Sequence, residues 1–361
     1  MVFVVKPRTH SAVLVANLAL TACGGGPIGG DADVANTGDT IDAAPDVPDA
    51  WTGPTTCPAV PFVIGSFERV YAPANQRYLN DHTVVQGDDG YWHLYGITNT
   101  GNGSPQTETH LLHARALSLF GPWEDLDDAL VTTGDESVLW APYVFRAPSG
   151  VWTMYYWGGT NSAAPRGLRI ATSTDLDHWQ RLATNDEPSL RPPGGRDPFL
   201  FDTGSHWLLF SVWQSPVFDT PQGQRAYGRI TVSRANDPTR TDEWNEPETV
   251  IQDPRPDFTW GNLESPFVVQ NECGYYLFVT RWNIDADDGD YQRTVVFTSR
   301  DPEHFAFEPV TELPAHAAEI VTDDAGRQYI TRAGWPGFIG EANRGLSVAR
   351  IGWAAAEVGD R

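Results

Sequence analysis

Methionine and cysteine are rare in this chain of 361 residues, which contains 2 Met and 3 Cys. Basic residues are also scarce, because 24 Lys and Arg stand against 47 Asp and Glu and give a formal net charge of −23. A surface with that balance repels phosphate backbones, so we expect no nucleic-acid partner. The acidity itself identifies no substrate.

Several motifs that hold cofactors are missing from the sequence. No Cys and His residues have zinc-site spacing, no Gly-Lys-Ser/Thr loop is present, and no dinucleotide fingerprint follows a strand pattern. The acidic stretch from Asn283 to Asp290 is not an EF-hand loop, because its glycine is misplaced and no glutamate closes it. We interpret it as a solvated turn. The motifs therefore predict no cofactor and no metal.

The N-terminal residues carry the pattern of an export signal. Lys6, Arg8 and His10 precede an apolar run over residues 11–22, which is too short to span a bilayer as a finished helix. The run ends in Leu-Thr-Ala-Cys, which resembles a bacterial lipoprotein signal. This resemblance implies that residues 1–22 are removed and that Cys23 is lipidated at the cell envelope. The alternative is a plain secretory signal with an unmodified Cys23.

Residues 23–58 are rich in Gly, Pro, Ala and Asp and show no apolar periodicity. Such a segment cannot bury a core, so we expect a flexible tether before a single domain over residues 59–361. The two other cysteines are Cys57 and Cys273. Export permits a disulfide between them, but the sequence leaves its presence open.

Aromatic and turn-forming residues are abundant, with 14 Trp, 12 Tyr, 16 Phe, 34 Gly and 28 Pro. Together with the scarcity of long helix formers, they predict an all-β protein. One hairpin pattern, a short apolar strand, a tight Gly/Asp/Asn turn and an aromatic strand, occurs five times. The five copies cover residues 80–98, 140–158, 196–213, 264–282 and 316–335.

Further strand patterns follow each hairpin, so each unit has about four strands and begins roughly fifty to seventy residues after the previous one. The last copy looks shortened. Repeated four-stranded units of this size predict a five-bladed β-propeller with four-stranded antiparallel blades and an axial active-site pocket. A solenoid would have shorter repeats, and a two-sheet sandwich would not repeat one hairpin five times.

The first strand of each propeller blade lines the central channel, so the starts of all five first strands should meet at one mouth. The residues at those starts are Asp81, Trp140–Ala141–Pro142, Asp197, Glu264 and His316. We expect Asp81 and Glu264 to occupy the place that Asp197 has in its own blade, with Arg196 beside them. Three carboxylates in one cavity are unfavourable unless they serve chemistry.

The five strand starts, NDH, WAP, RDP, ESP and HAAE, resemble the five-bladed propeller glycosidases of glycoside hydrolase families 32, 68 and 43. The resemblance covers residues 60–355. Arg196-Asp197-Pro198 matches the fructosidase-type motif fully, whereas His82 replaces a proline and Ser265 replaces a cysteine. The WAP turn and His316 are more like the arabinosidase and xylosidase family. The chain thus combines two signatures.

The resemblance implies a role for each carboxylate. Glu264 would be the general acid, with its pKa raised by the two aspartates. Asp81 would be the nucleophile, or the base in an inverting enzyme. Asp197 would bind sugar hydroxyls and stabilise the positively charged transition state, while Arg196 would grip a hydroxyl and keep Asp197 ionised.

Further candidate pocket residues lie at or near the same strand starts. Asn80 and His316 would contact the substrate, and His316 could also help hold a central calcium or other ion. Trp140 and Trp260 would stack on a sugar face, because each lies close to a strand start.

The leading functional hypothesis is an exported, monomeric glycoside hydrolase that cleaves furanosides of the fructoside or arabinoside type in an oligo- or polysaccharide. One alternative is an inverting arabinosidase or xylosidase. Another is a sugar-binding lipoprotein that has lost catalysis, and a third is glycosyl transfer in place of hydrolysis.

Overall fold

The computed structural model describes residues 57–100, 105–134, 136–159, 167–183, 191–258, 262–281, 290–334 and 344–355. Cys23, Trp260 and residues 283–289 of the predicted solvated turn lie outside the described residues. In the described part, regular structure consists of strands and short 3-10 helices such as η1 (Pro105–Thr107) and η4 (Asp290–Gln292). None of its helices is long and apolar enough to cross a membrane.

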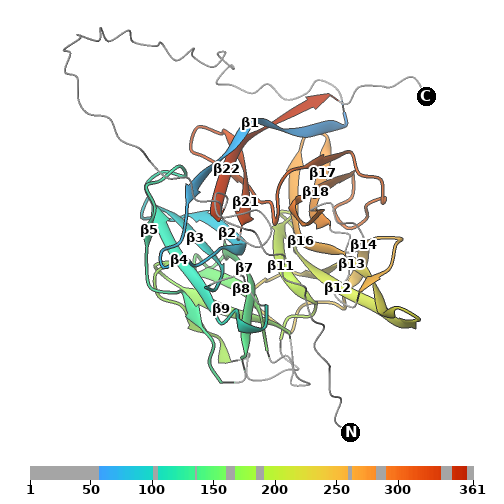
Figure 1. Ribbon diagram of the computed structural model, residues 1–361, viewed down its shortest axis with the longest axis horizontal. Coiled ribbons are helices and arrows are strands. Elements are labelled where there is room, and N and C mark those ends of the chain that lie inside the picture. Colours follow the sequence, from blue (N-terminus) through green and yellow to red (C-terminus); the bar gives the residue numbers. More distant parts are fainter. Residues whose placement is uncertain are drawn as a thin grey trace, which may run out of the picture. The chain divides into compact units, whose positions relative to one another are not determined.

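The strands form five separate antiparallel sheets, which are the predicted blades (Figure 1). Blade I consists of β2 (Asn80–Gln86), β3 (Trp92–Thr98), β4 (His110–Ala116) and β5 (Glu124–Asp125), with β6 (Leu130–Val131) also paired to β4. Blade II consists of β7 (Val138–Arg146), β8 (Trp152–Gly159), β9 (Gly167–Ser173) and β10 (Gln180–Arg181).

The next two blades repeat this order. Blade III consists of β11 (Arg196–Asp202), β12 (Trp207–Thr220), β13 (Gly223–Ala235) and β14 (Glu248–Gln252), with β15 (Asp257–Phe258) also paired to β13. Blade IV consists of β16 (Leu263–Asn271), β17 (Gly274–Arg281), β18 (Thr294–Ser299) and β19 (Thr311–Leu313). The all-β, five-bladed architecture predicted from the repeats is therefore confirmed.

Blade V is completed by the beginning of the chain. Its strands are β20 (Ile320–Thr322), β21 (Gln328–Gly334), β22 (Gly345–Ala355) and β1 (Ala59–Tyr71). The last repeat looked shortened in the sequence because its fourth strand, β1, precedes all the others. Antiparallel pairing of β1 with β22 closes the ring of blades.

A disulfide joins Cys57, just before β1, to Cys273 in the turn between β16 and β17. The two Cα atoms are 5.3 Å apart across a sequence separation of 216 residues. The pairing that the sequence left open is thus present, and it ties the closing strand to blade IV.

The core consists of apolar layers between neighbouring blades. Strands β3 and β8 are buried along their whole length, because each sheet is covered on both faces. One such layer contains Tyr95, Ile97 and Leu111 of blade I together with Leu139 and Met154 of blade II. Burial of each large apolar side chain contributes about 1.5–3 kcal/mol, so blade-to-blade packing fixes the inner strands that carry the site.

Candidate active site

Each blade has one non-glycine residue with a positive φ angle near the start of its inner strand. These residues are Asp81 (24°), Ala141 (45°), Asp197 (56°), Ser265 (49°) and Ala317 (48°). In the first four blades the strand register also shifts at this residue, as in a β-bulge. Residues with side chains avoid such angles, at a cost of about 1–3 kcal/mol each. Bulges re-aim side chains beside active sites.

The bulges define two rings of residues around the axis. The bulge ring contains the five residues with positive φ. The preceding ring contains the residues one position earlier, Asn80, Trp140, Arg196, Glu264 and His316. The expectation that Glu264 occupies the same place as Asp81 and Asp197 was wrong by one residue. Their equivalent in blade IV is Ser265, and Glu264 is the equivalent of Arg196.

Arg196 connects two of the three predicted carboxylates. Its Nη1 lies 2.5 Å from Asp197 Oδ2, and its Nη2 lies 2.5 Å from Glu264 Oε1. The Asp197 and Glu264 side chains are buried, with exposed fractions of 3% and 8%, and the Arg196 side chain is 14% exposed. The guanidinium group thus spans blades III and IV and neutralises part of the buried negative charge.

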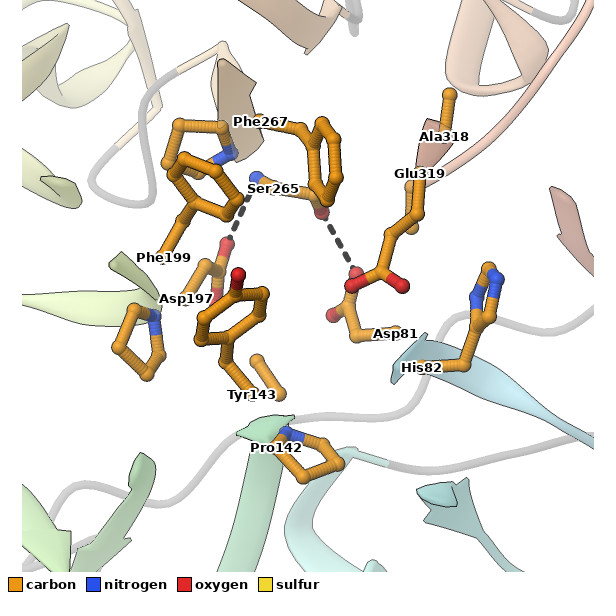
Figure 2. A pocket seen from close by; sticks show the side chains of 14 residues that line it. Asp81, His82, Pro142, Tyr143, Asp197, Phe199, Ser265, Phe267, Ala318 and Glu319 are labelled. Carbon is orange, nitrogen blue, oxygen red and sulfur yellow. Dashed lines mark hydrogen bonds between the residues drawn. The ribbon is translucent and has the colours of Figure 1, made fainter. Parts of the chain in front are cut away.

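Ser265 connects the third carboxylate to the same network (Figure 2). Its hydroxyl donates to Asp81 Oδ1 at 2.6 Å, and its backbone N–H donates to Asp197 Oδ2 at 3.1 Å. Asp81, Asp197 and Glu264 therefore belong to one continuous chain of hydrogen bonds, although they come from three blades.

The buried charges shift the titration of this network. Burial and, to a smaller extent, the Glu264 carboxylate raise the pKa of Asp81 to about 6, while the Ser265 hydroxyl and the Arg196 guanidinium oppose the rise. Burial also raises the pKa of Asp197, against the attraction of the Arg196 guanidinium. Burial alone would lower the pKa of Arg196, but Asp197 and Glu264 raise it, so the guanidinium stays charged.

Asn80 and His316 lie beside Asp81, as the sequence predicted. His316 Nε2 is 2.7 Å from Asn80 Oδ1 and 3.9 Å from Asp81 Oδ1. Burial lowers the pKa of His316 to about 4, so the ring is neutral near pH 7. A neutral imidazole at this place can orient Asn80 without cancelling the charge of Asp81.

Trp140 belongs to the preceding ring, but part of its surface is used within blade II. Its ring stacks on Trp157, with centroids 4.7 Å apart and planes at 12°, and its Nε1 donates to the carbonyl of Pro105 at 3.2 Å. One face of Trp140 is therefore covered by protein.

Sequence reasoning missed Tyr291 of η4, which contacts two predicted site residues. Its hydroxyl donates to Glu264 Oε2 at 2.5 Å, and its ring stacks on His316 with centroids 4.4 Å apart. Both oxygens of Glu264 thus have partners. Tyr291 directly follows the stretch interpreted as a solvated turn, and no sequence signal marks it.

Glu319 was also missed, although it ends the HAAE motif of blade V. Its side chain is buried, its Oε2 accepts the N–H of Val84 at 3.1 Å, and burial raises its pKa to about 8. It lines the channel together with Asp81 (Figure 2).

A small cavity lies at the bulge ring and receives residues from all five blades, among them Asp81, Tyr143, Asp197, Phe267 and Glu319. Its volume is about 30 Å³, which is the volume of roughly one water molecule. This differs from the expected sugar-sized hollow.

A second cavity, of about 350 Å³, shares Tyr143, Phe199 and Phe267 with the first. These three rings therefore lie between an acidic space and one lined mainly by apolar residues.

No family model and no curated protein matches this sequence. Among solved structures, a thermostable family-43 glycoside hydrolase is similar with a TM-score of 0.58 and 15% identity, over 78% of this chain and 92% of that one. The α-L-arabinofuranosidase from Lactobacillus brevis has a TM-score of 0.53 and 13% identity, over 78% and 92% of the two chains.

A family-32 β-fructofuranosidase from Bombyx mori is also similar, with a TM-score of 0.54 and 16% identity, over 79% of this chain and 62% of that one. The chain thus has the five-bladed propeller fold found in these glycoside hydrolases. The resemblance inferred from the five strand starts is confirmed for the fold.

Proposed function

We propose that the chain is a glycoside hydrolase that cleaves furanosidic bonds of the fructoside or arabinoside type. The observation that carries this proposal is the buried network in which Arg196 and Ser265 join Asp81, Asp197 and Glu264 at the propeller axis. Glycoside hydrolysis requires a carboxylic acid at the departing oxygen and a carboxylate at the anomeric centre. The network supplies both groups, because Arg196 holds Glu264 and Asp197 while Ser265 holds Asp81.

Each residue has one proposed task in the reaction. Glu264 protonates the departing oxygen, and Asp81 attacks the anomeric carbon or removes a proton from the attacking water. With a pKa of about 6, Asp81 is ionised near pH 7 and available for either task. Asp197, held by Arg196 and the Ser265 N–H, stabilises positive charge on the sugar.

The sugar approaches from the side of the preceding ring. The cavity on the other side of Asp81 has a volume of only about 30 Å³, and the rings of Tyr143, Phe199 and Phe267 line it. Asn80, Arg196 and His316 then contact hydroxyl groups, and Trp140 offers its uncovered face. Trp260 is proposed as a further stacking residue from its place in the sequence.

A sugar-binding protein without catalysis is the second candidate, and the contacts of Glu264 favour it. Arg196 occupies Oε1 and Tyr291 occupies Oε2, whereas a general acid must present an oxygen to the substrate. Catalysis therefore requires substrate to displace one of these partners. A binding protein requires no such displacement.

The test is a screen of aryl-furanosides, aryl-xylosides and fructans, with the first product anomer identified by NMR. Turnover by the wild type that Asp81→Asn abolishes supports the hydrolase. Saturable sugar binding without turnover supports the binding protein. The first anomer also distinguishes retention from inversion, and a transferred sugar in the product would reveal transfer.

We also propose that the protein is exported and anchored to the cell envelope through lipid on Cys23. The Leu-Thr-Ala-Cys sequence after an apolar run supports this location. A surface-anchored hydrolase would meet oligosaccharides outside the cell.

A further inference from the structure

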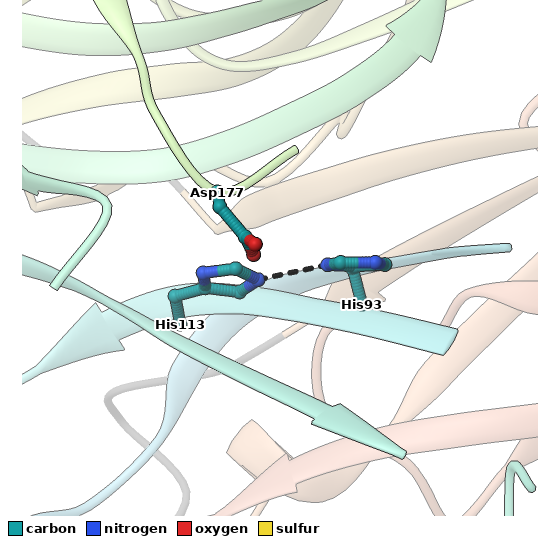
Figure 3. A group of neighbouring side chains, drawn as sticks. All are labelled: His93, His113 and Asp177. Atoms are coloured by element: carbon teal, nitrogen blue, oxygen red, sulfur yellow. Dashed lines mark hydrogen bonds between the residues drawn. The ribbon is translucent and has the colours of Figure 1, made fainter. Parts of the chain in front are cut away.

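A second cluster of titratable side chains lies between blades I and II. His93 of β3, His113 of β4 and Asp177, which precedes β10, each place a possible ligand atom within 4.8 Å of the other two (Figure 3). None of the three belongs to the network around Asp81. Two imidazoles with a carboxylate are unusual in an otherwise apolar layer.

The two histidines are close and held in place. His93 Nδ1 lies 2.9 Å from His113 Nε2, and both residues are buried. The ring of Tyr95 stacks on His113, with centroids 4.6 Å apart and planes at 17°. Two ligands of a tetrahedral zinc ion are about 3.3 Å apart, so the rings need to separate by only a few tenths of an ångström.

Asp89 fixes the protonation of His93. Its two carboxylate oxygens lie 3.2 and 3.4 Å from His93 Nε2, so this nitrogen donates to Asp89 and Nδ1 keeps its lone pair. In the 2.9 Å contact His113 Nε2 then carries the proton, and binding of an ion at Nε2 requires that proton to move to Nδ1. Metal-binding histidines commonly donate their other N–H to a carboxylate in this way.

Asp177 gives the cluster a negative charge and is the ligand through which solvent can reach it. Its carboxylate points at the contact between the two histidines (Figure 3). Within the described residues, Oδ1 is buried without a hydrogen-bond partner, whereas Oδ2 lies 3.5 Å from Arg115 Nη1. A buried carboxylate oxygen without a donor is unfavourable, and a cation would satisfy it. The side chain is 34% exposed, which gives an ion access from solvent.

We propose that His93, His113 and Asp177 bind a divalent transition-metal ion, with Zn²⁺ as the best match and water as the fourth ligand. Two imidazoles and one carboxylate suit zinc, whereas calcium and magnesium prefer oxygen ligands alone. Asp89 orients His93 from outside the ligand shell. The ion joins β3 and β4 of blade I to the segment before β10 of blade II, so its role is to fasten two blades together.

Calorimetric titration of the chelator-treated full-length protein with ZnCl₂ tests the site. We expect one bound ion per chain. At a zinc concentration about 100 times Kd, we expect Tm to rise by about 4–6 °C. Asp177→Asn, which keeps the shape of the side chain, should weaken binding at least tenfold. Asp89→Asn should weaken it by about 10–100-fold, as expected for a partner of a metal ligand.

Two histidines serve as controls for zinc binding at the surface. His178 follows Asp177, is 88% exposed and pairs with Asp175, and His304 forms the same kind of pair with Asp301 in blade IV. His178→Ala and His304→Ala should each bind zinc like the wild type. His113→Gln, checked for folding by circular dichroism, should lose the site. The proposal is overturned if the wild type binds no zinc, if His178→Ala removes binding, or if Asp177→Asn and folded His113→Gln both bind normally.

Discussion

The hydroxyl of Ser265 donates a 2.6 Å hydrogen bond to Asp81, although the two residues are 184 positions apart in the sequence. The bond stabilises the ionised form of Asp81 and so opposes the rise in its pKa that burial causes. Ser265 is therefore a positioning residue for Asp81, and it reaches that place because the bulge of blade IV faces that of blade I.

The first prediction concerns the acid side of the pH–activity profile. If ionised Asp81 is required, kcat/KM should rise with pH through an apparent pKa of about 6, well above the usual range for aspartate. Ser265→Ala removes a bond that favours the ionised form, so this limb should move to higher pH. Values of kcat/KM measured between pH 4 and 9 for both proteins test this prediction. If Ser265→Ala leaves the acid limb of the profile at the same pH as in the wild type, Asp81 is not the group that determines this limb.

The second prediction separates stability from activity at Asp81. Because its pKa is higher in the folded protein than in the unfolded one, the folded state binds more protons between about pH 4 and 6. Its contribution to stability therefore falls as pH rises through that window. Asp81→Asn should abolish turnover, yet raise Tm relative to the wild type more at pH 8 than at pH 4. An equal change of Tm at both pH values would contradict the raised pKa.

The third prediction concerns closure of the ring. Replacing both Cys57 and Cys273 by serine should lower stability by about 2–5 kcal/mol, because the disulfide ties the closing strand β1 to blade IV. Thermal unfolding with and without reductant measures this loss. Reductant should destabilise the wild type but leave the double variant unchanged, and equal sensitivity of both proteins would exclude the disulfide as the cause.

The fourth prediction concerns the lipid anchor. Cys23→Ser removes the only thiol in the Leu-Thr-Ala-Cys sequence, so the variant should leave the membrane fraction and appear in soluble form. Cell fractionation followed by immunoblotting measures the distribution. Retention of Cys23→Ser in the membrane fraction at the level of the wild type would refute the anchor.

Much of the fold could be predicted because a propeller repeats its signals. Each blade shows the same hairpin, and the five strand starts mark the bulges where backbone strain concentrates. Closure by β1 could not be predicted, since that strand is far in sequence from its partner β22. The correct ring for Glu264, in contrast, could be predicted, because the tripeptides NDH, RDP and ESP align Glu264 with Asn80 and Arg196 and align Ser265 with the two aspartates.

The missed site residues depend on long-range contacts. Tyr291 reaches Glu264 from a segment that has no recognisable pattern. The pair His93 and His113 becomes a possible metal site only when β3 lies beside β4 and blade II brings Asp177 to it. Spacing along one segment cannot reveal ligands that meet across two blades.

The most direct test of catalysis by this network compares the wild type with Glu264→Gln on two matched furanosides, one with a nitrophenyl group and one with a sugar as the leaving group. A nitrophenolate departs without protonation, whereas a sugar alkoxide requires the acid. We predict that Glu264→Gln lowers kcat/KM on the sugar-linked substrate by about 10²–10⁴-fold and on the nitrophenyl substrate much less. Equal losses on both substrates, or no turnover by the wild type on either, would contradict Glu264 as the general acid.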